Sequence, residues 1–419
     1  MRTVNLSIGL ILLTALFSFV DNENELKLIL ENTYPISSIS STDTNFDDLL
    51  FLADILQDKR VVILGETGHR DGLAFKAKVR LIKYLHEELG YNLIAFEGAT
   101  PFGMFRVSEG IKRDSTLENV LQQFRIGLYG GWSRSLEFQE LAKYVRNRFD
   151  SLSVIGIDNN FRSSFFPRFF PPRLDQWYDL ANSTEINYER FVKNYDGLVT
   201  DSDLVGDQSF EQVVSDIQII RNIVNNHVDT SSLRKDYLNH ELDNLLSFIA
   251  EFQVDLETGI ALRDRQMAEN LFWAMDNFYP DEKVIIWTAN FHGAKNLSQA
   301  IYAEGDDFYQ RMIATGQHIA DKYGEENVYS IAFTSSEREV QSETEDFVIF
   351  PETTWEGRFA KKYDKEFAFI NLTPIRASEF GKKQFESTVF GRPILGKWYN
   401  IFDGYFFIRR MEFSTYDFN

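Results

Sequence analysis

Polar side chains that could do chemistry follow four short apolar segments of this sequence, close to the point where each segment ends. These polar residues are Glu66, His69, Glu97, Asp158, Asn290 and His292. The chain has only six histidines, so two in such positions are informative. A histidine can take a proton from water while a nearby carboxylate orients its ring, and a second histidine or a cation can stabilise the oxyanion that forms. The pattern predicts a water-activating site.

The elements that must position these residues alternate between strand and helix. Short β-branched or apolar segments predict strands, and the longer segments with helical spacing predict helices. Strands are predicted at 60–64, 92–96, 153–157, 283–287, 328–333, 367–372 and 405–408, and helices at 73–89 and 137–148 and within 209–278. This order predicts an α/β fold with a mostly parallel sheet flanked by helices. Ligands gather at the carboxyl ends of such strands, where the polar residues stand.

The sequence predicts one large domain, with two segments before it and a helical insertion within it. Residues 1–20 combine an early Arg2 with an apolar run and predict a signal peptide, with an uncleaved anchor as the rival. Residues 21–45 are a polar lead-in, and 46–419 form the domain, with a helical insertion or lid at about 205–280. We therefore expect export to the periplasm or the medium, with no membrane insertion beyond the N-terminal segment.

Composition excludes several classes of function. A net charge of −20 argues against nucleic acid as a partner, because a polyanion would be repelled. The absence of cysteine excludes disulfides, thiolate metal sites and a cysteine nucleophile. The sequence contains neither Gly-x-Ser-x-Gly, nor a phosphate-binding loop, nor His-Glu-x-x-His. The sequence does not fix the oligomeric state.

Several blocks resemble the erythromycin esterase family, in the family's order. They are LGETGHRDGLAFKAKVRLIKYLHEELGYNLIAFEG, WSRSLEFQELAKYVRNRF with VIGIDNN, RDRQMAENLFWAM with VIIWTANFH, and FDGYFFI. The resemblance implies metal-independent hydrolysis of an ester or lactone, with no cofactor and with macrolides among the candidate substrates. It implies His69 as general base, Glu66 and Glu97 as its supporting carboxylates, and His292 as the second histidine. Lys78, Asp158, Asn290 and Arg263 are the expected substrate-binding residues, and Asp264 falls near the site.

Two positions depart from the family pattern and leave other functions open. Ala289 stands where the family usually has histidine, and Lys78 stands where it usually has arginine, whose planar fork grips an oxyanion with two bonds. A metal-assisted hydrolase is one alternative, since Glu66, His69, Glu97 and His292 are all acceptable ligands. A non-catalytic envelope protein that binds a glycan or small molecule is another. If His69 is the base, the rate should inflect between about pH 6 and 8.

Overall fold

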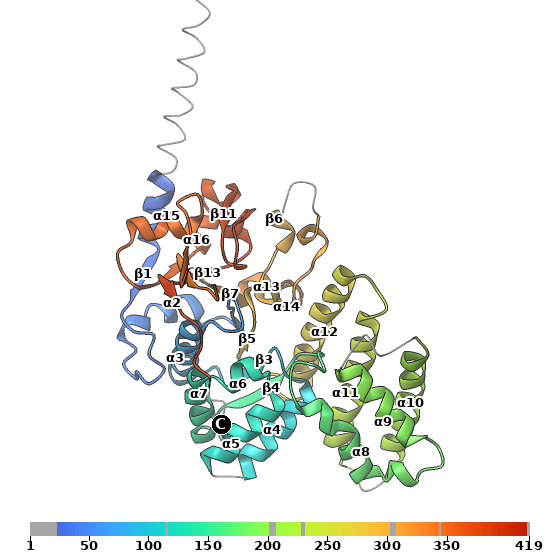
Figure 1. Ribbon diagram of the computed structural model, residues 1–419. Coiled ribbons are helices and arrows are strands. Elements are labelled where there is room, and N and C mark those ends of the chain that lie inside the picture. Colours follow the sequence, from blue (N-terminus) through green and yellow to red (C-terminus); the bar gives the residue numbers. More distant parts are fainter. Residues whose placement is uncertain are drawn as a thin grey trace, which may run out of the picture.

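The computed structural model describes residues 23–113, 116–200, 207–227, 231–301, 307–342 and 345–416. The expected signal peptide at 1–20 lies outside these residues. A central sheet runs through the molecule, with helices on both faces and a separate group of helices to one side (Figure 1). No helix within the described ranges is long and apolar enough to cross a membrane.

The central sheet has eight strands, six of them parallel. Their order is β1 (Thr33–Ile36), β10 (Phe367–Asn371), β13 (Gly404–Ile408), β7 (Val328–Thr334), β2 (Val61–Leu64), β5 (Val284–Trp287), β3 (Leu93–Phe96) and β4 (Ser153–Gly156). The strands from β13 to β4 pair in parallel, whereas β10 pairs antiparallel with both β13 and β1. The predicted α/β fold with a mostly parallel sheet is therefore confirmed, with an antiparallel edge that the sequence did not predict.

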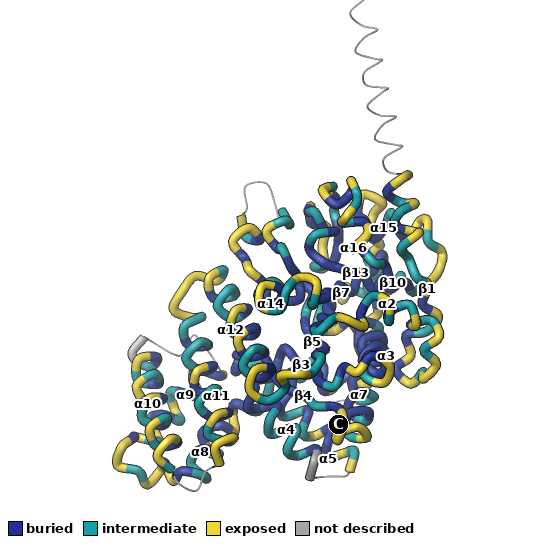
Figure 2. The backbone as a smooth tube through the Cα atoms, turned by 180° about the vertical axis from the view of Figure 1, so that it is seen from behind, coloured by how far each residue is buried: buried dark blue, intermediate teal, exposed yellow. Residues whose placement is uncertain are grey.

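Both faces of the sheet are covered, which explains why its strands are apolar throughout. Successive side chains of a strand point to opposite faces. In β2, Val62 and Leu64 pack in one core with residues of α3 (Gly72–Leu89) and α7 (Leu136–Asn147). Val61 and Ile63 pack in another core with residues of α12 (Leu256–Asn277) and α14 (Thr315–Tyr323). Figure 2 shows the buried sheet between its helices. Besides a group of helices to one side and a helix near the N-terminus, the described α-helices are α2 (Leu52–Leu56), α3, α4 (Pro101–Arg113), α5 (Leu117–Gly127), α6 (Gly130–Ser133), α7, α13 (Asn290–Gly293), α14, α15 (Trp355–Lys362) and α16 (Thr373–Arg376).

The lateral helices build a core of their own. They are α8 (Phe170–Tyr178), α9 (Tyr188–Thr200), α10 (Asp207–Asn226), α11 (Ser232–Glu251) and α12 (Leu256–Asn277). Side-chain caps start two of them: Ser231 accepts from the N–H of Arg234, and Asp255 accepts from that of Thr258. The range 205–280, where an insertion is predicted, contains α10, α11 and α12, and α8 and α9 pack with them.

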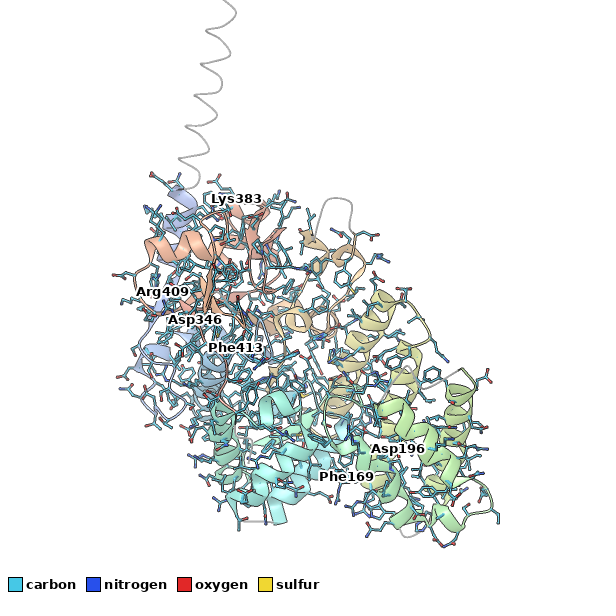
Figure 3. All side chains as sticks on the ribbon, in the orientation of Figure 1. Phe169, Asp196, Asp346, Lys383, Arg409 and Phe413 are labelled. Atoms are coloured by element: carbon cyan, nitrogen blue, oxygen red, sulfur yellow. The ribbon has the colours of Figure 1, made fainter. Side chains whose placement is uncertain are left out.

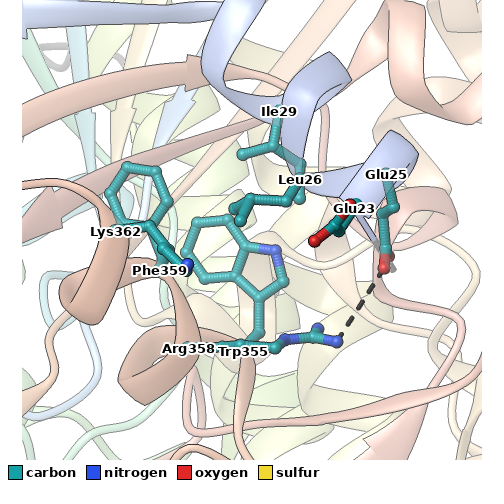
Figure 4. Close-up of a pocket in the computed structure, with 8 residues that line it drawn as sticks. All are labelled: Glu23, Glu25, Leu26, Ile29, Trp355, Arg358, Phe359 and Lys362. Atoms are coloured by element: carbon teal, nitrogen blue, oxygen red, sulfur yellow. Dashed lines mark ion pairs between the residues drawn. The ribbon is translucent and has the colours of Figure 1, made fainter. Parts of the chain in front are cut away.

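Two small sheets and an N-terminal helix complete the molecule. One sheet contains β11 (Phe385–Ser387), β12 (Ile394–Gly396) and β6 (Ala300–Ile301), and the other contains β14 (Arg410–Met411), β8 (Glu337–Glu339) and β9 (Phe347–Ile349). The described part of the polar lead-in is a helix at 23–31 followed by β1. Figure 4 shows this helix against α15, with Glu25 facing Arg358. Glu25 is buried and also accepts from Lys383 and Tyr399.

Candidate active site

Four parallel strands end in register, and the segments that follow them meet at one edge of the sheet. The last residues of β2, β5, β3 and β4 are paired neighbours, Leu64 with Trp287, Trp287 with Phe96 and Phe96 with Gly156. The next residues of each chain segment therefore reach the same end of the sheet. The backbone fixes this meeting further, since the N–H of Asn290 donates to the carbonyl of Glu66 (2.7 Å).

A cavity of about 260 Å³ opens at this edge. It is lined by His69, Glu97, Gly98, Tyr129, Trp132, Asp158, Asn160, Arg162, Ser163 and Arg263. Four of the residues expected from the sequence thus share one cavity: His69, Glu97, Asp158 and Arg263. The other four, Glu66, Lys78, Asn290 and His292, do not line it but contact residues that do or that hold its wall.

His69 is held by a buried carboxylate. Its Nδ1 lies 3.0 Å from Oε1 of Glu66, which is fully buried. The indole N–H of Trp132 donates to the same oxygen (2.7 Å), and the Lys78 ammonium donates to Oε2 (2.7 Å). With Nδ1 bound to Glu66, the Nε2 atom of the ring is left for a reacting group. A carboxylate–histidine pair of this kind orients the imidazole for proton transfer.

The charges around His69 favour its protonated form. Burial works to lower the pKa of His69, but the hydrogen bond to Glu66 and the negative charges of Glu97 and Glu66 outweigh it and raise the pKa to about 9. The positive charge of Arg263 opposes this only in part. The ring is nevertheless accessible, because 41% of the side chain is exposed.

Arg263, on α12, joins the ends of β3 and β4. Its Nε and Nη2 donate to the two carboxylate oxygens of Asp158 (2.9 and 2.8 Å), and Nη2 also donates to Oε1 of Glu97 (3.1 Å). Glu97 accepts further bonds at Oε2 from the hydroxyl of Thr288 and the N–H of Ala289. The pKa of Glu97 is lowered: burial opposes its ionisation, but the positive charges of His292, Arg263 and His69 dominate.

His292 lies behind Arg263 and is almost buried. Its Nδ1 is 2.9 Å from Oδ1 of Asp264, and its Nε2 is 3.0 Å from Nη1 of Arg263 and 3.4 Å from Oε1 of Glu97. A neutral ring accepts from Arg263 at Nε2, whereas a protonated ring donates to Glu97. Burial lowers the pKa of His292, but the carboxylates of Asp264 and Glu97 raise it overall. The structure therefore places His292 against Arg263 and not in the cavity.

Lys78 and Asn290, expected to bind substrate, lie beneath the cavity wall. The Lys78 ammonium is fully buried, where burial lowers its pKa, and it donates to Glu66 and to the carbonyl of Thr288 (3.1 Å). The Asn290 amide donates to the carbonyls of Phe333 (2.8 Å) and Val389 (2.7 Å), and its Oδ1 accepts from the N–H of Phe333. The polar groups of both side chains thus bond to other groups of the protein. This fits a role in positioning better than one in substrate contact.

The sequence did not single out six of the ten residues that line the cavity, Gly98 among them. Tyr129 and Trp132 come from the segment around α6, and Asn160, Arg162 and Ser163 come from the segment after β4. The rings of Tyr129 and Trp132 both meet the His69 ring edge-on, with centroids 5.5 Å apart. The available signal was weak: Trp132 begins one family-like block, but nothing in its spacing indicates that it points towards His69.

The four acidic and histidine residues that could act as metal ligands, Glu66, His69, Glu97 and His292, do not fit a metal centre. Both oxygens of Glu66 already accept from Trp132, His69 or Lys78, and the Arg263 guanidinium contacts both Glu97 and His292. A divalent cation there would meet a fixed positive charge at short range. Across the described part of the chain, no three histidine or acidic side chains form a group that could hold a metal ion.

The fold and the cavity define a parallel α/β protein that gathers a histidine–carboxylate pair and a buried arginine cluster at the carboxyl ends of its strands. The chain belongs to the erythromycin esterase family, whose family model matches residues 86–410. Membership of this family points to a hydrolase, and the family expected from the sequence is thereby confirmed.

Similar proteins agree with this assignment. A putative hydrolase of Bacillus subtilis, YbfO, is 28% identical over 63% of this chain, and the match spans 63% of that relative's length. An erythromycin esterase type II of Escherichia coli is 21% identical over 71% of this chain and 74% of its own.

Solved structures show the same fold. A protein from Bacillus cereus has a TM-score of 0.71 at 16% identity and covers 94% of this chain and 99% of its own. A mutant of the erythromycin esterase EreC, in its open conformation, has a TM-score of 0.66 at 18% identity and covers 90% of this chain and 97% of its own.

Proposed function

We propose that this hydrolase cleaves a carboxylic ester or lactone by attack of a water molecule that His69 activates. The observation that carries the proposal is the accessible ring of His69, bound through Nδ1 to a buried carboxylate at 3.0 Å, in a cavity that also contains the Arg263 cation. Family membership supports hydrolysis in general.

Each group in the cavity then has a role in the proton balance. Neutral His69 takes a proton from water at Nε2 while the oxygen attacks the ester carbonyl carbon. The resulting oxyanion is stabilised by the positive charge of Arg263. When the tetrahedral intermediate collapses, protonated His69 returns the proton to the leaving alcohol and is neutral again. Glu66 orients the ring throughout, and His292, Asp158 and Glu97 hold Arg263.

Direct attack of water has a kinetic signature. No acyl-enzyme forms, so 4-nitrophenyl acetate should release nitrophenolate without a pre-steady-state burst. A stoichiometric burst would refute direct attack.

The metal-assisted alternative is tested by removal of metal. Dialysis against EDTA should leave the rate unchanged. A loss of rate on dialysis that zinc or manganese restores would favour that alternative. Rates no higher than the uncatalysed background for both the wild type and a His69→Ala variant would favour a binding protein.

The pH dependence should follow the raised pKa of His69. At neutral pH most of the imidazole is protonated, so the rate should rise with pH and level off above about pH 9, later than the pH 6 to 8 expected from the sequence. The double variant Glu66→Gln, Lys78→Met replaces this charged pair with neutral side chains. It removes the anion that raises the pKa of His69, and it leaves no lysine without its partner. The inflection of kcat/KM should then fall by roughly one to two pH units.

A pH–rate profile of both proteins checks this prediction. The comparison with Lys78→Met alone shows how much of the effect belongs to the lysine. An inflection that stays at the same pH in the double variant would mean that a group other than His69 controls the rate.

Macrolide cleavage and export are further parts of this proposal. An erythromycin esterase of Escherichia coli is among the relatives, so a macrolide lactone belongs in any panel of substrates offered to the purified protein. The apolar segment after Arg2 supports export to the periplasm or the medium.

A further inference from the structure

A second and larger cavity, of about 500 Å³, adjoins the first. The two share Tyr129, Arg162 and Ser163 in their walls, so they lie side by side. We refer to the larger one as the arginine cavity. Its lining residues are Arg70, Tyr129, Gly130, Gly131, Arg134, Arg162, Ser163, Ser164, Phe165, Arg168 and Tyr416.

The arginine cavity is strongly positive on a strongly negative protein. Four arginines line it, and no acidic side chain is among its described lining residues, although the chain as a whole carries a net charge of −20. Arg70, Arg134 and Arg168 are exposed, so solvent screens part of their mutual repulsion, but their summed positive charge attracts a negative group into the space.

Aromatic rings hold two of these guanidinium groups in place without neutralising them. Arg70 lies over the ring of Phe413, which is labelled in Figure 3, at 5.0 Å. Arg134 lies over the ring of Phe165 at 5.1 Å. Within the described ranges, neither of these arginines forms an ion pair with a carboxylate. Stacking on a ring fixes the plane of a guanidinium and leaves its N–H edge and its charge for another partner.

The other two arginines complete the positive wall. Arg162 donates from Nε and Nη2 to the carbonyl of Leu198. Arg168 shares the ring of Phe165 with Arg134, at 5.6 Å, and its charge also acts on Asp196.

We propose that the arginine cavity binds an anionic group, a carboxylate or a phosphate, of the molecule whose ester bond is cleaved beside His69. The guanidinium fork matches both anions, since each offers two oxygens to paired N–H donors. Because the two cavities share a wall, such an anion lies on the same substrate as the ester. The proposal rests on the hydrolase function proposed above for the ester, whereas binding of the anion itself needs no turnover.

Matched esters test the preference. Hydrolysis of 4-acetoxybenzoate and 4-acetoxyphenyl phosphate is compared with that of the neutral methyl 4-acetoxybenzoate, and 4-nitrophenyl adipate with 4-nitrophenyl hexanoate. The wild type should favour an anionic ester about tenfold in kcat/KM, as expected for hydrogen bonds to a charged group, and added NaCl should reduce this preference by screening. The variant Arg70→Gln, Arg134→Gln should lose it. The control Arg311→Gln, Arg410→Gln removes two half-exposed arginines outside both cavities and should keep it.

Direct binding separates the two proposals. Calorimetric titration with inorganic phosphate and with glutarate at low salt should give heat with the wild type and the control, and none with the Arg70→Gln, Arg134→Gln variant. The stronger ligand identifies the source of the anion. Equal binding by all three proteins, or no preference for any anionic ester, would overturn the arginine cavity as an anion site. If the anions bind as expected but no ester is cleaved faster than by His69→Ala, the hydrolase function fails and the anion site stands.

Discussion

Replacing Arg263 with methionine is expected to lower the free energy of unfolding by roughly 3–5 kcal/mol. Arg263 is the cation shared by Glu97 and Asp158, whose side chains are 3% and 0% exposed. Methionine fills similar space but leaves two buried carboxylates without their positive partner. A buried charge that has lost its partner is far costlier than an exposed one. Urea unfolding followed by circular dichroism measures the change.

The same helix supplies the control. Arg265 stands two residues further along α12, is 65% exposed and pairs with Glu269 at 2.7 Å. Because exposed ion pairs contribute little, Arg265→Met should cost no more than about 1 kcal/mol. Equal losses in the two variants would mean that the Arg263 cluster does not hold the ends of β3 and β4 together.

A second substitution shows where the loss arises. In the Arg263→Met background, Asp158→Asn removes one of the two stranded charges and should recover part of the stability. In the wild-type background the same change should be destabilising, since Asp158 accepts two bonds from Arg263 and one each from the N–H groups of Gly98 and Asn160 (both 3.0 Å). Opposite signs in the two backgrounds identify coupled residues. Additive losses would contradict the cluster.

Most of the central sheet could be predicted because its strands are buried on both faces. Segments such as Val61–Leu64 and Val284–Trp287 are continuous apolar runs, and an α/β alternation limits how they can pair. The antiparallel edge escaped prediction for the opposite reason. Thr33–Ile36 is short, contains Pro35 and has one fully buried residue, so its pairing with β10 depends on tertiary contacts that no local pattern records.

The positions of the candidate site residues could likewise be predicted only in part. The rule that ligands collect at the carboxyl ends of parallel strands placed Glu97 and Asp158 correctly at the edge where the cavity opens, because it depends only on strand direction. Strand direction does not predict how deeply a side chain is buried. Lys78 on α3 and Asn290 on α13 stand near the same edge, yet their side chains turn to buried partners. Which way a side chain points depends on rotamers and neighbours, which spacing does not determine.

Replacing His69 with alanine should reduce kcat for ester hydrolysis by a factor of about 10² to 10⁴, the usual contribution of a general base. The fold should survive, because 41% of the side chain is exposed and Glu66 keeps its bonds from Trp132 and Lys78. The unfolding midpoint should therefore change little while the rate collapses.

The control is His318→Ala, which removes a partly buried histidine on α14 that does not line the cavity. It should leave kcat unchanged. High concentrations of imidazole should restore part of the rate to the His69→Ala variant, because a free base can enter the half-exposed space that the ring leaves. Full activity in His69→Ala, with its fold intact, would show that water is activated elsewhere. The arrangement around Glu66 would then be a structural feature of this edge of the sheet and not its chemistry.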